Sequence, residues 1–266
     1  MDRMHRPSKI VGLLAGVVFF LAAFLVAAPS LDTFDHAHRQ WDTVLKEYTR
    51  SKDGGTWVDY RSLSKSPSRL EGYLQELESV PRPIFETWQR SQQLAFLINA
   101  YNAWTVQLIL SHYPIESILE IEKPWKQPLV RLWGEALSLD RLEHGLIRPD
   151  FDEPRIHFAL NCAARSCPPL RREAFEASRL EEQLEESAQQ FLGDARNNRV
   201  ELDSGKVRLN LSKIFEWYGN DFQSRYGGVL PFVAPRISDD RNVKSRIREG
   251  KVEVHYLEYD WGLNGQ

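Results

Sequence analysis

Residues 84–112 constrain the fold of this chain more than any other segment. The second half of the segment, residues 94–110, is apolar on nearly every side of a helix. Other elements must cover such a helix on all faces, so the pattern predicts a central buried helix. The polar residues within it need hydrogen-bond partners. Asn99 and Asn102, spaced i and i+3, therefore either bond to neighbouring backbone or point together into a pocket.

Periodic patterns along the rest of the chain indicate further helices and several short strands. Helices are predicted over residues 32–50, 66–79, 138–147, 180–192, 212–222 and 239–248. Extended segments are predicted over residues 56–60, 155–161, 200–209 and 252–257, with a hairpin tip over 133–137. Because helices outnumber the short, partly hairpin-linked strands, the expected class is α+β, a mostly helical single domain around one central helix.

Residues 1–30 differ from the rest of the chain. Arg3, Arg6 and Lys9 precede an uncharged run of 19 residues, 10–28. A basic flank directs such a run into a membrane with its basic end on the cytoplasmic side, and the run is long enough to cross a bilayer. We therefore expect an anchor in the inner (cytoplasmic) membrane and a single exported domain over residues 31–266. Cleavage of the run as a signal segment, which releases a secreted or periplasmic protein, is the alternative.

The composition, with 42% apolar and 27% charged residues, is that of an ordinary globular protein. The formal net charge of −3 offers no basic surface for nucleic acid. The expected partners are a substrate or envelope partner of unknown identity, and the membrane through the N-terminal segment. The sequence implies no cofactor.

The two cysteines of the chain, Cys162 and Cys167, both lie within residues 157–170. A strand-like alternation over residues 155–161 runs into a turn that two prolines close. Reactive groups are often positioned in this way, by a rigid strand that leads into a fixed loop. We expect Cys162, at the strand exit, to be the presented thiol, whereas Cys167 precedes the prolines and packs.

Several roles are open to the two thiols. In an exported protein they commonly form a disulfide, and a free cysteine is commonly a small buried hydrophobic residue. Histidine, cysteine and glutamate residues that could bind a metal lie nearby in the sequence. Their spacing matches no standard zinc pattern, so no metal ligands are assigned. A redox dithiol is disfavoured, because Cys-x4-Cys lacks the tight Cys-x-x-Cys spacing.

A catalytic role requires a thiolate, and therefore a base or a positive neighbour. The preferred arrangement has Cys162 as nucleophile and His144 as general base, with Glu143 or Asp260 orienting the imidazole. Arg165 or backbone N–H groups then stabilise the oxyanion. The candidate binding residues are Asn99, Asn102, His157, Ser166 and Asp260.

Five blocks in order resemble the domain-of-unknown-function 547 family. They are residues 96–103, 142–148, 157–170, 215–222 and 259–264. The resemblance spans roughly residues 94–264. The family has no established activity, so it implies no reaction, substrate or cofactor.

Two functions remain open. The first is a thiol-dependent hydrolase or acyl transferase that uses Cys162 and His144. The second is a non-catalytic envelope module that binds a partner through residues 162–169, its cysteines serving only packing or a bridge.

Overall fold

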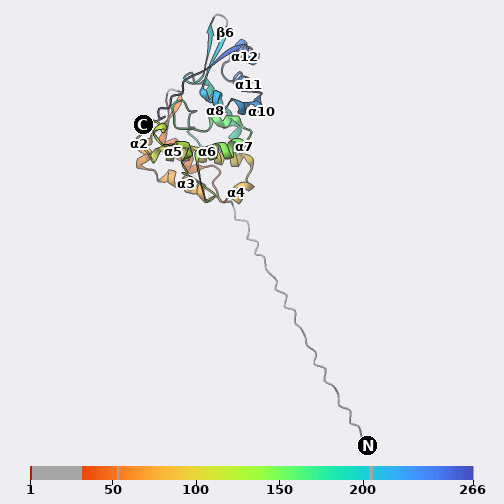
Figure 1. Ribbon diagram of the computed structural model, residues 1–266. Helices are drawn as coiled ribbons and strands as arrows, with labels where there is room; N and C mark the ends of the chain where they lie inside the picture. The colour runs from red at the N-terminus through yellow and green to blue at the C-terminus, as the bar shows by residue number, and fades with distance from the viewer. Residues whose placement is uncertain (2–31, 53, 204–205, 266) are drawn as a thin grey trace. The chain divides into compact units, whose positions relative to one another are not determined.

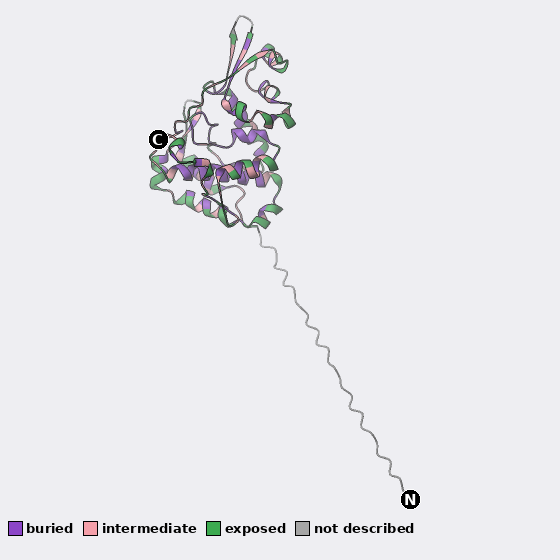
Figure 2. Cartoon of the chain, viewed as in Figure 1, coloured by how far each residue is buried: buried purple, intermediate pink, exposed green. Residues whose placement is uncertain are grey.

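Helix α5 (Arg90–Leu110) lies at the centre of the fold and is buried along most of its length. The computed structural model describes residues 1, 32–52, 54–203 and 206–265. Figures 1 and 2 show α5 crossing the middle of the domain, with buried residues on nearly every turn. The central buried helix predicted from sequence is thus confirmed, but its start differs. A separate helix, α4 (Arg82–Thr87), precedes it, and the chain restarts at Gln89, where Gln92 completes a capping box.

The predicted membrane segment, residues 10–28, lies outside the described residues. Among the helices that the structure describes, none is long and apolar enough to span a bilayer. Asp32–Gln266 form one compact unit.

Helices and a hairpin precede α5, and two of the helices, α2 and α3, contact it. The elements are α1 (Arg39–Tyr48), β1 (Thr49–Lys52), β2 (Gly55–Val58), α2 (Tyr60–Lys65) and α3 (Ser68–Ser79). Strands β1 and β2 are antiparallel. Helix α3 buries Leu70, Tyr73, Leu74 and Leu77, the apolar positions that its periodicity marks.

Short elements connect α5 to the cysteine loop. They are η1 (Ile118–Glu120), η2 (Pro124–Lys126), β3 (Val130–Leu132), β4 (Glu135–Leu137), α6 (Leu139–Leu142), η3 (Glu143–Ile147), α7 (Arg148–Asp150) and η4 (Pro154–Phe158). Strands β3 and β4 form the predicted hairpin, and the Ser138 hydroxyl caps α6 by accepting from the N–H of Arg141. Element η3 is a π-helical turn.

The prediction of a strand over residues 155–161 is wrong. The chain there forms the 3-10 helix η4, which begins with Pro154 and whose N-terminus the Glu153 carboxylate caps. The alternation is misleading because this segment is buried on both sides, including the polar side chains of Arg155 and His157. Tertiary burial, not the pleat of a sheet, explains its apolar residues.

A second group of elements follows the cysteine loop. It comprises α8 (Leu180–Gly193), β5 (Arg199–Asp203), β6 (Lys206–Leu211), α9 (Lys213–Trp217), η5 (Gly219–Phe222), α10 (Gln223–Tyr226), α11 (Val229–Val233), α12 (Arg241–Arg248) and β7 (Val252–Tyr256). The sheet order is β5-β6-β7, antiparallel in the first pair and parallel in the second. The fold is therefore a mixture of helices and small sheets.

The buried side chains form two hydrophobic clusters, and the segment of η4 before the cysteine loop contributes to both. One cluster surrounds α5, and the other gathers Phe158 with aromatic and aliphatic residues of α8 to α12. Ile156 and Ala159 belong to the first cluster, whereas Phe158 belongs to the second. The segment that leads into Cys162 is therefore held from both sides, so the loop starts from a fixed position.

Candidate thiol site

The loop after η4 folds back on itself and brings Cys162 and Cys167 together. Ala163 has a positive φ of 63°, a left-handed conformation that reverses the chain. The side-chain oxygen of Asn161 accepts from the N–H of Ala163, and the N–H of Cys167 donates to the carbonyl of Ala164. As a result the two sulfur atoms lie 2.6 Å apart, and both cysteines are free.

Two asparagines fix the start of this loop. The amide of Asn102 donates to the carbonyl of Ala159 and accepts from the N–H of Asn161, at 2.9 and 2.8 Å. Asn161 donates in turn to the carbonyl of Pro168, 2.8 Å away. The central helix therefore holds both ends of the loop through buried side-chain amides.

The C-terminal segment after β7 lies along the loop. Arg165 donates its N–H to the carbonyl of Gly262, Ser166 donates to that of Asp260, and Asn264 donates to that of Ala163. This pairing brings the hydroxyl of Tyr259 to 3.3 Å from the sulfur of Cys162.

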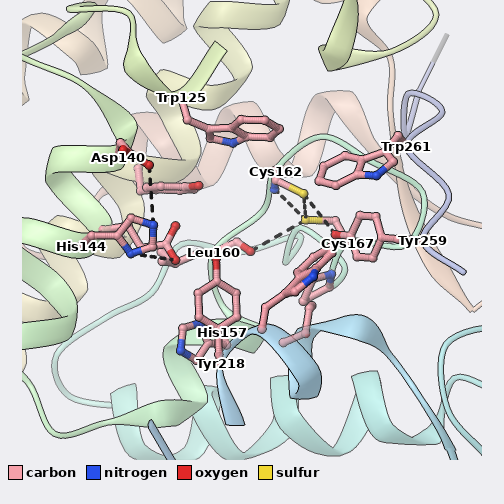
Figure 3. A pocket seen from close by; sticks show the side chains of 15 residues that line it. Trp125, Asp140, His144, His157, Leu160, Cys162, Cys167, Tyr218, Tyr259 and Trp261 are labelled. Atoms are coloured by element: carbon pink, nitrogen blue, oxygen red, sulfur yellow. Dashed lines mark hydrogen bonds and ion pairs between the residues drawn. The ribbon is translucent and has the colours of Figure 1, made fainter. Parts of the chain in front are cut away.

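A cavity of about 350 Å³ opens over Cys162. Figure 3 shows the two sulfurs on one side of it and His144 and Asp140 on the other. The lining residues are Tyr101, Trp125, Asp140, Glu143, His144, His157, Leu160, Cys162, Cys167, Pro168, Ile214, Trp217, Tyr218, Tyr259 and Trp261. Trp125, Trp217, Tyr259 and Trp261 contact one another ring to ring and form what we call the aromatic wall.

The two thiols differ in burial and in protonation. Cys162 is half-buried at the cavity, and Cys167 is only 6% exposed. Hydrogen bonds from the Cys167 thiol, the Tyr259 hydroxyl and the Ala164 N–H lower the pKa of Cys162, against the opposing effect of its burial. Burial raises the pKa of Cys167 well above its ordinary value, and the neighbouring Cys162 adds to this. Of the two thiols, Cys162 is therefore the one that ionises more readily.

Tyr259 is a proton donor at this site. Burial raises its pKa well above the ordinary value, and the charge of the nearby Cys162 raises it further. The phenol therefore keeps its proton and can donate it in the hydrogen bond that it shares with the sulfur of Cys162.

His144 lines the same cavity but is bonded to Arg148 rather than to a thiol. The guanidinium of Arg148 lies 2.9 Å from Nδ1 of His144. Since a guanidinium only donates, Nδ1 accepts, and the neutral ring carries its proton on Nε2. That N–H faces the Asp140 carboxylate at 3.6 Å. In this tautomer His144 is a donor to the cavity, not a base, which differs from the role that we expected from sequence.

Arg148 also connects His144 to His157 through Asp221. It donates two hydrogen bonds to the Asp221 carboxylate, at 2.8 and 2.7 Å. His157 contacts the same carboxylate at 2.7 Å and stacks on the ring of Tyr218. His157 and Arg148 together hold the pKa of Asp221 well below its ordinary value. This network fixes both histidines at the cavity wall.

The structure brings Cys162, Glu143, His144 and His157 of the predicted residues to one cavity. Five others lie elsewhere. Asn102 binds the loop backbone, and Asn99 binds both backbone groups of Phe175. Their bonds are with backbone groups, one of the two alternatives that the sequence left open.

The remaining three predicted residues belong to the seam between the loop and the C-terminal segment. The hydroxyl of Ser166 accepts from the N–H of Asp260, and the Asp260 carboxylate accepts from Gly262. Arg165 is half-exposed and pairs with Asp260 at 3.7 Å. None of the three lines the cavity over Cys162, so Arg165 is not positioned for the oxyanion role that we expected, nor Asp260 for orienting His144.

Several cavity residues were not among the predicted site residues. Tyr259 and Tyr218 escaped sequence reasoning, although both lie in blocks that resemble the family. Trp125, Trp217 and Trp261 also line the cavity. In a single sequence, the pattern around an aromatic residue does not show whether its side chain lines a cavity or packs in the core.

No group of three or more metal-ligating side chains occurs within the described ranges. The nearest donor set, Cys162 and Cys167, is a sulfur pair with a phenol beside it.

The comparisons with known proteins identify a class. Residues 85–192 match the sequence profile described as "Protein of unknown function, DUF547". The resemblance found in the sequence is thus shown for this range, which contains α5, His144 and both cysteines. Tyr218, Tyr259 and the aromatic wall apart from Trp125 lie beyond it. Neither the curated proteins nor the solved structures gave a match.

Proposed function

We propose that this protein is a thiol-dependent acyl transferase or hydrolase in which the Cys162 thiolate attacks an acyl group bound in the cavity. One observation carries the proposal. The sulfur of Cys162 borders a cavity of about 350 Å³ and is hydrogen-bonded to Cys167, to the hydroxyl of Tyr259 and to the backbone N–H of Ala164. Donors aimed at a sulfur favour its anion, which is the nucleophilic form.

His144 acts on the substrate in this proposal. Arg148 fixes the tautomer of His144, so Nε2 carries a proton at the wall opposite Cys162, where it faces the Asp140 carboxylate at 3.6 Å. A neutral imidazole that donates a hydrogen bond stabilises the negative charge that develops on an acyl oxygen. His144 therefore takes the oxyanion role, and the donors around Cys162 replace a general base.

Glu143 is the candidate base for the second half-reaction. It is a buried residue that lines the cavity and whose side chain bonds to the hydroxyl of Tyr218. A carboxylate held at the wall can accept a proton from the water or alcohol that removes the acyl group from Cys162.

The chemistry favours acyl donors with a good leaving group. His144 is a weak acid for a poor leaving group, because the neutral ring that accepts from Arg148 through Nδ1 holds its proton on Nε2. A thioester releases a thiolate, which needs no proton to leave at neutral pH. Thioesters with an apolar or aromatic acyl group suit the aromatic wall.

A labelling experiment tests the proposal. The full-length protein is mixed with benzoyl thioester, and intact mass and peptide mapping locate the acyl group. We expect acylation at Cys162 alone, with a pH midpoint below the value of about 8.5 for a free cysteine. Cys162→Ser serves as the inactive variant. Acylation that is absent, or that occurs equally at lysines in Cys162→Ser, would overturn the proposal.

The binding-module alternative has less support. Most of residues 162–169 are buried, and only Arg165 is exposed. A loop with so little accessible surface offers a partner few contacts.

We further propose that the domain is exported and held at the inner membrane. Support comes from Arg3, Arg6 and Lys9 ahead of the uncharged run over residues 10–28. A C-terminal reporter that is active only in the cytoplasm should be silent. Strong cytoplasmic activity would contradict this orientation.

A further inference from the structure

The spacing Cys-x4-Cys does not keep the two thiols apart. The left-handed Ala163 and the turn from Ala164 to Cys167 reverse the chain between them. Their sulfurs lie 2.6 Å apart, only slightly farther than the bond of about 2.05 Å in a disulfide. The Cys-x4-Cys spacing disfavours a redox dithiol only if it keeps the thiols apart, and in the folded loop they are in contact.

The two cysteines also differ in a way that matches the two steps of disulfide exchange. Cys162 borders the cavity and has the lowered pKa, so it is the thiol that a substrate meets first. Cys167 is buried behind it and touches both the sulfur and the backbone N–H of Cys162. An attacking thiol at the surface with a buried resolving thiol beside it is the arrangement that disulfide exchange requires.

We propose that Cys162 and Cys167 form a reversible dithiol–disulfide couple that reduces small disulfides bound in the cavity. The thiolate of Cys162 attacks one sulfur of R–S–S–R, an S–S bond forms to Cys162, and R–S⁻ leaves. Cys167 gives its proton to that thiolate and attacks the sulfur of Cys162, and the second R–S⁻ leaves and takes a proton from water. Two protein thiols become one disulfide, and one substrate disulfide becomes two thiols.

The second step is helped by the local hydrogen bonds. The backbone N–H of Cys162 donates to the sulfur of Cys167 at 2.7 Å and stabilises its thiolate. Before the first step, the charge and hydrogen bond of Cys162 oppose ionisation of Cys167. In the mixed disulfide Cys162 carries no charge, so this opposition ends when Cys167 must act.

The cavity favours neutral or cationic disulfides over anionic ones. Asp140 and Glu143 line it, and among its described lining residues there is neither lysine nor arginine. The aromatic wall attracts cations through its ring faces. Disulfides of similar size but different charge distinguish a charge preference from a limit set by the size of the cavity. Suitable compounds are cystamine, bis(2-hydroxyethyl) disulfide and dithiodipropionate.

The inference uses the thiolate of the proposed acyl-transfer site but does not need that reaction. Mass spectrometry of the reduced full-length protein after mixing with bis(2-hydroxyethyl) disulfide tests it. The parent should lose two hydrogen atoms and join Cys162 to Cys167. Cys167→Ser should stop at a mixed disulfide on Cys162, and Cys162→Ser should react at least about tenfold more slowly.

Cys167→Ala is a second variant at the same position, and the thermal unfolding of each variant shows whether it is folded. If the parent itself accumulates the mixed disulfide, Cys167 does not resolve it and the couple is refuted. Benzoyl thioester labelling of Cys167→Ser separates the two proposals. If that variant is acylated and also traps the mixed disulfide, both the acyl-transfer and the disulfide-exchange proposals are supported. If it is acylated but the parent forms no internal disulfide, only the dithiol–disulfide couple is refuted.

The charge preference is measured as the rate at which each disulfide is reduced, with dithiothreitol as the reductant. Each rate is divided by the rate without protein. We expect the rate with cystamine to exceed the rate with dithiodipropionate by about tenfold, which corresponds to about 1.4 kcal/mol. A reversed order would refute the assignment of substrate charge.

Discussion

The hydroxyl of Tyr259 lies 3.3 Å from the sulfur of Cys162, although the two residues are 97 positions apart. The contact depends on the pairing of the C-terminal segment with residues Ala163 to Ser166, which three backbone hydrogen bonds hold. The thiol and its phenol donor thus come from different parts of the chain. Only the thiol lies within the range that matches DUF547.

Replacing Tyr259 by Phe should raise the pKa of Cys162. A hydrogen bond to a charged group contributes about 1.5–3 kcal/mol, and the thiolate loses one of its donors. We expect the pH midpoint of alkylation to rise by about one unit or more. Tyr256→Phe, at an exposed position of β7, is the matched control and should leave the midpoint unchanged. Equal midpoints in both variants would exclude Tyr259 as a donor.

Replacing Asn102 by Leu should destabilise the fold. The change leaves the carbonyl of Ala159 and the N–H of Asn161 without partners in a buried place, at a cost of about 1–3 kcal/mol each. Gln107→Leu on the same helix loses only a bond to the hydroxyl of Ser111 and is the control. Urea unfolding measures both. An Asn102→Leu protein as stable as the parent but without activity would instead assign Asn102 to the site.

The central helix and most short elements were predictable because their patterns are local. The apolar run of residues 94–110 leaves no exposed face, and the periodicity of residues 66–79 matches α3 closely. The position of the candidate site was also predictable, since the loop there contains the two cysteines of the chain.

The partners of Cys162 were not predictable from local pattern. Residues 155–161 alternate like a strand because two hydrophobic clusters cover the segment from both sides, and they form η4 instead. Tyr259 reaches the thiol through pairing of distant backbone, which no periodicity encodes. The role of His144 depends on which ring nitrogen Arg148 contacts, a detail of tertiary geometry.

Stability at acid pH should depend on Asp221. Its pKa in the folded protein is depressed by His157 and Arg148, so the unfolded chain binds the proton more tightly. The stabilisation is therefore complete above the unfolded value of about 3.9 and is lost as the pH falls below it. Asp221→Asn should be less stable than the parent at pH 7, by about 1–3 kcal/mol.

Urea unfolding of Asp221→Asn and the parent at pH 7, 5 and 3.5 measures this dependence. The difference between the two proteins should begin to shrink at the lowest pH, because the parent then starts to lose the contribution of Asp221, which disappears fully only as the pH falls through the depressed folded-state pKa. Asp239→Asn, at a fully exposed carboxylate, is the control. A difference that grows on acidification would contradict the depressed pKa.

Replacing His144 by Ala separates the two roles that this residue has been given. A His144 base would lower the pKa of Cys162, and its removal would raise the pH midpoint of alkylation. The hydrogen bond from Arg148 to Nδ1 leaves the Nε2 proton in place, so we expect the midpoint to stay within about 0.3 units of the parent value. Acylation of Cys162 by benzoyl thioester should nevertheless slow by about a hundredfold, the effect of one lost oxyanion donor. His255→Ala, at an exposed position of β7, should change neither quantity. A midpoint that rises in His144→Ala alone would restore the dyad expected from sequence, with His144 as the base of Cys162.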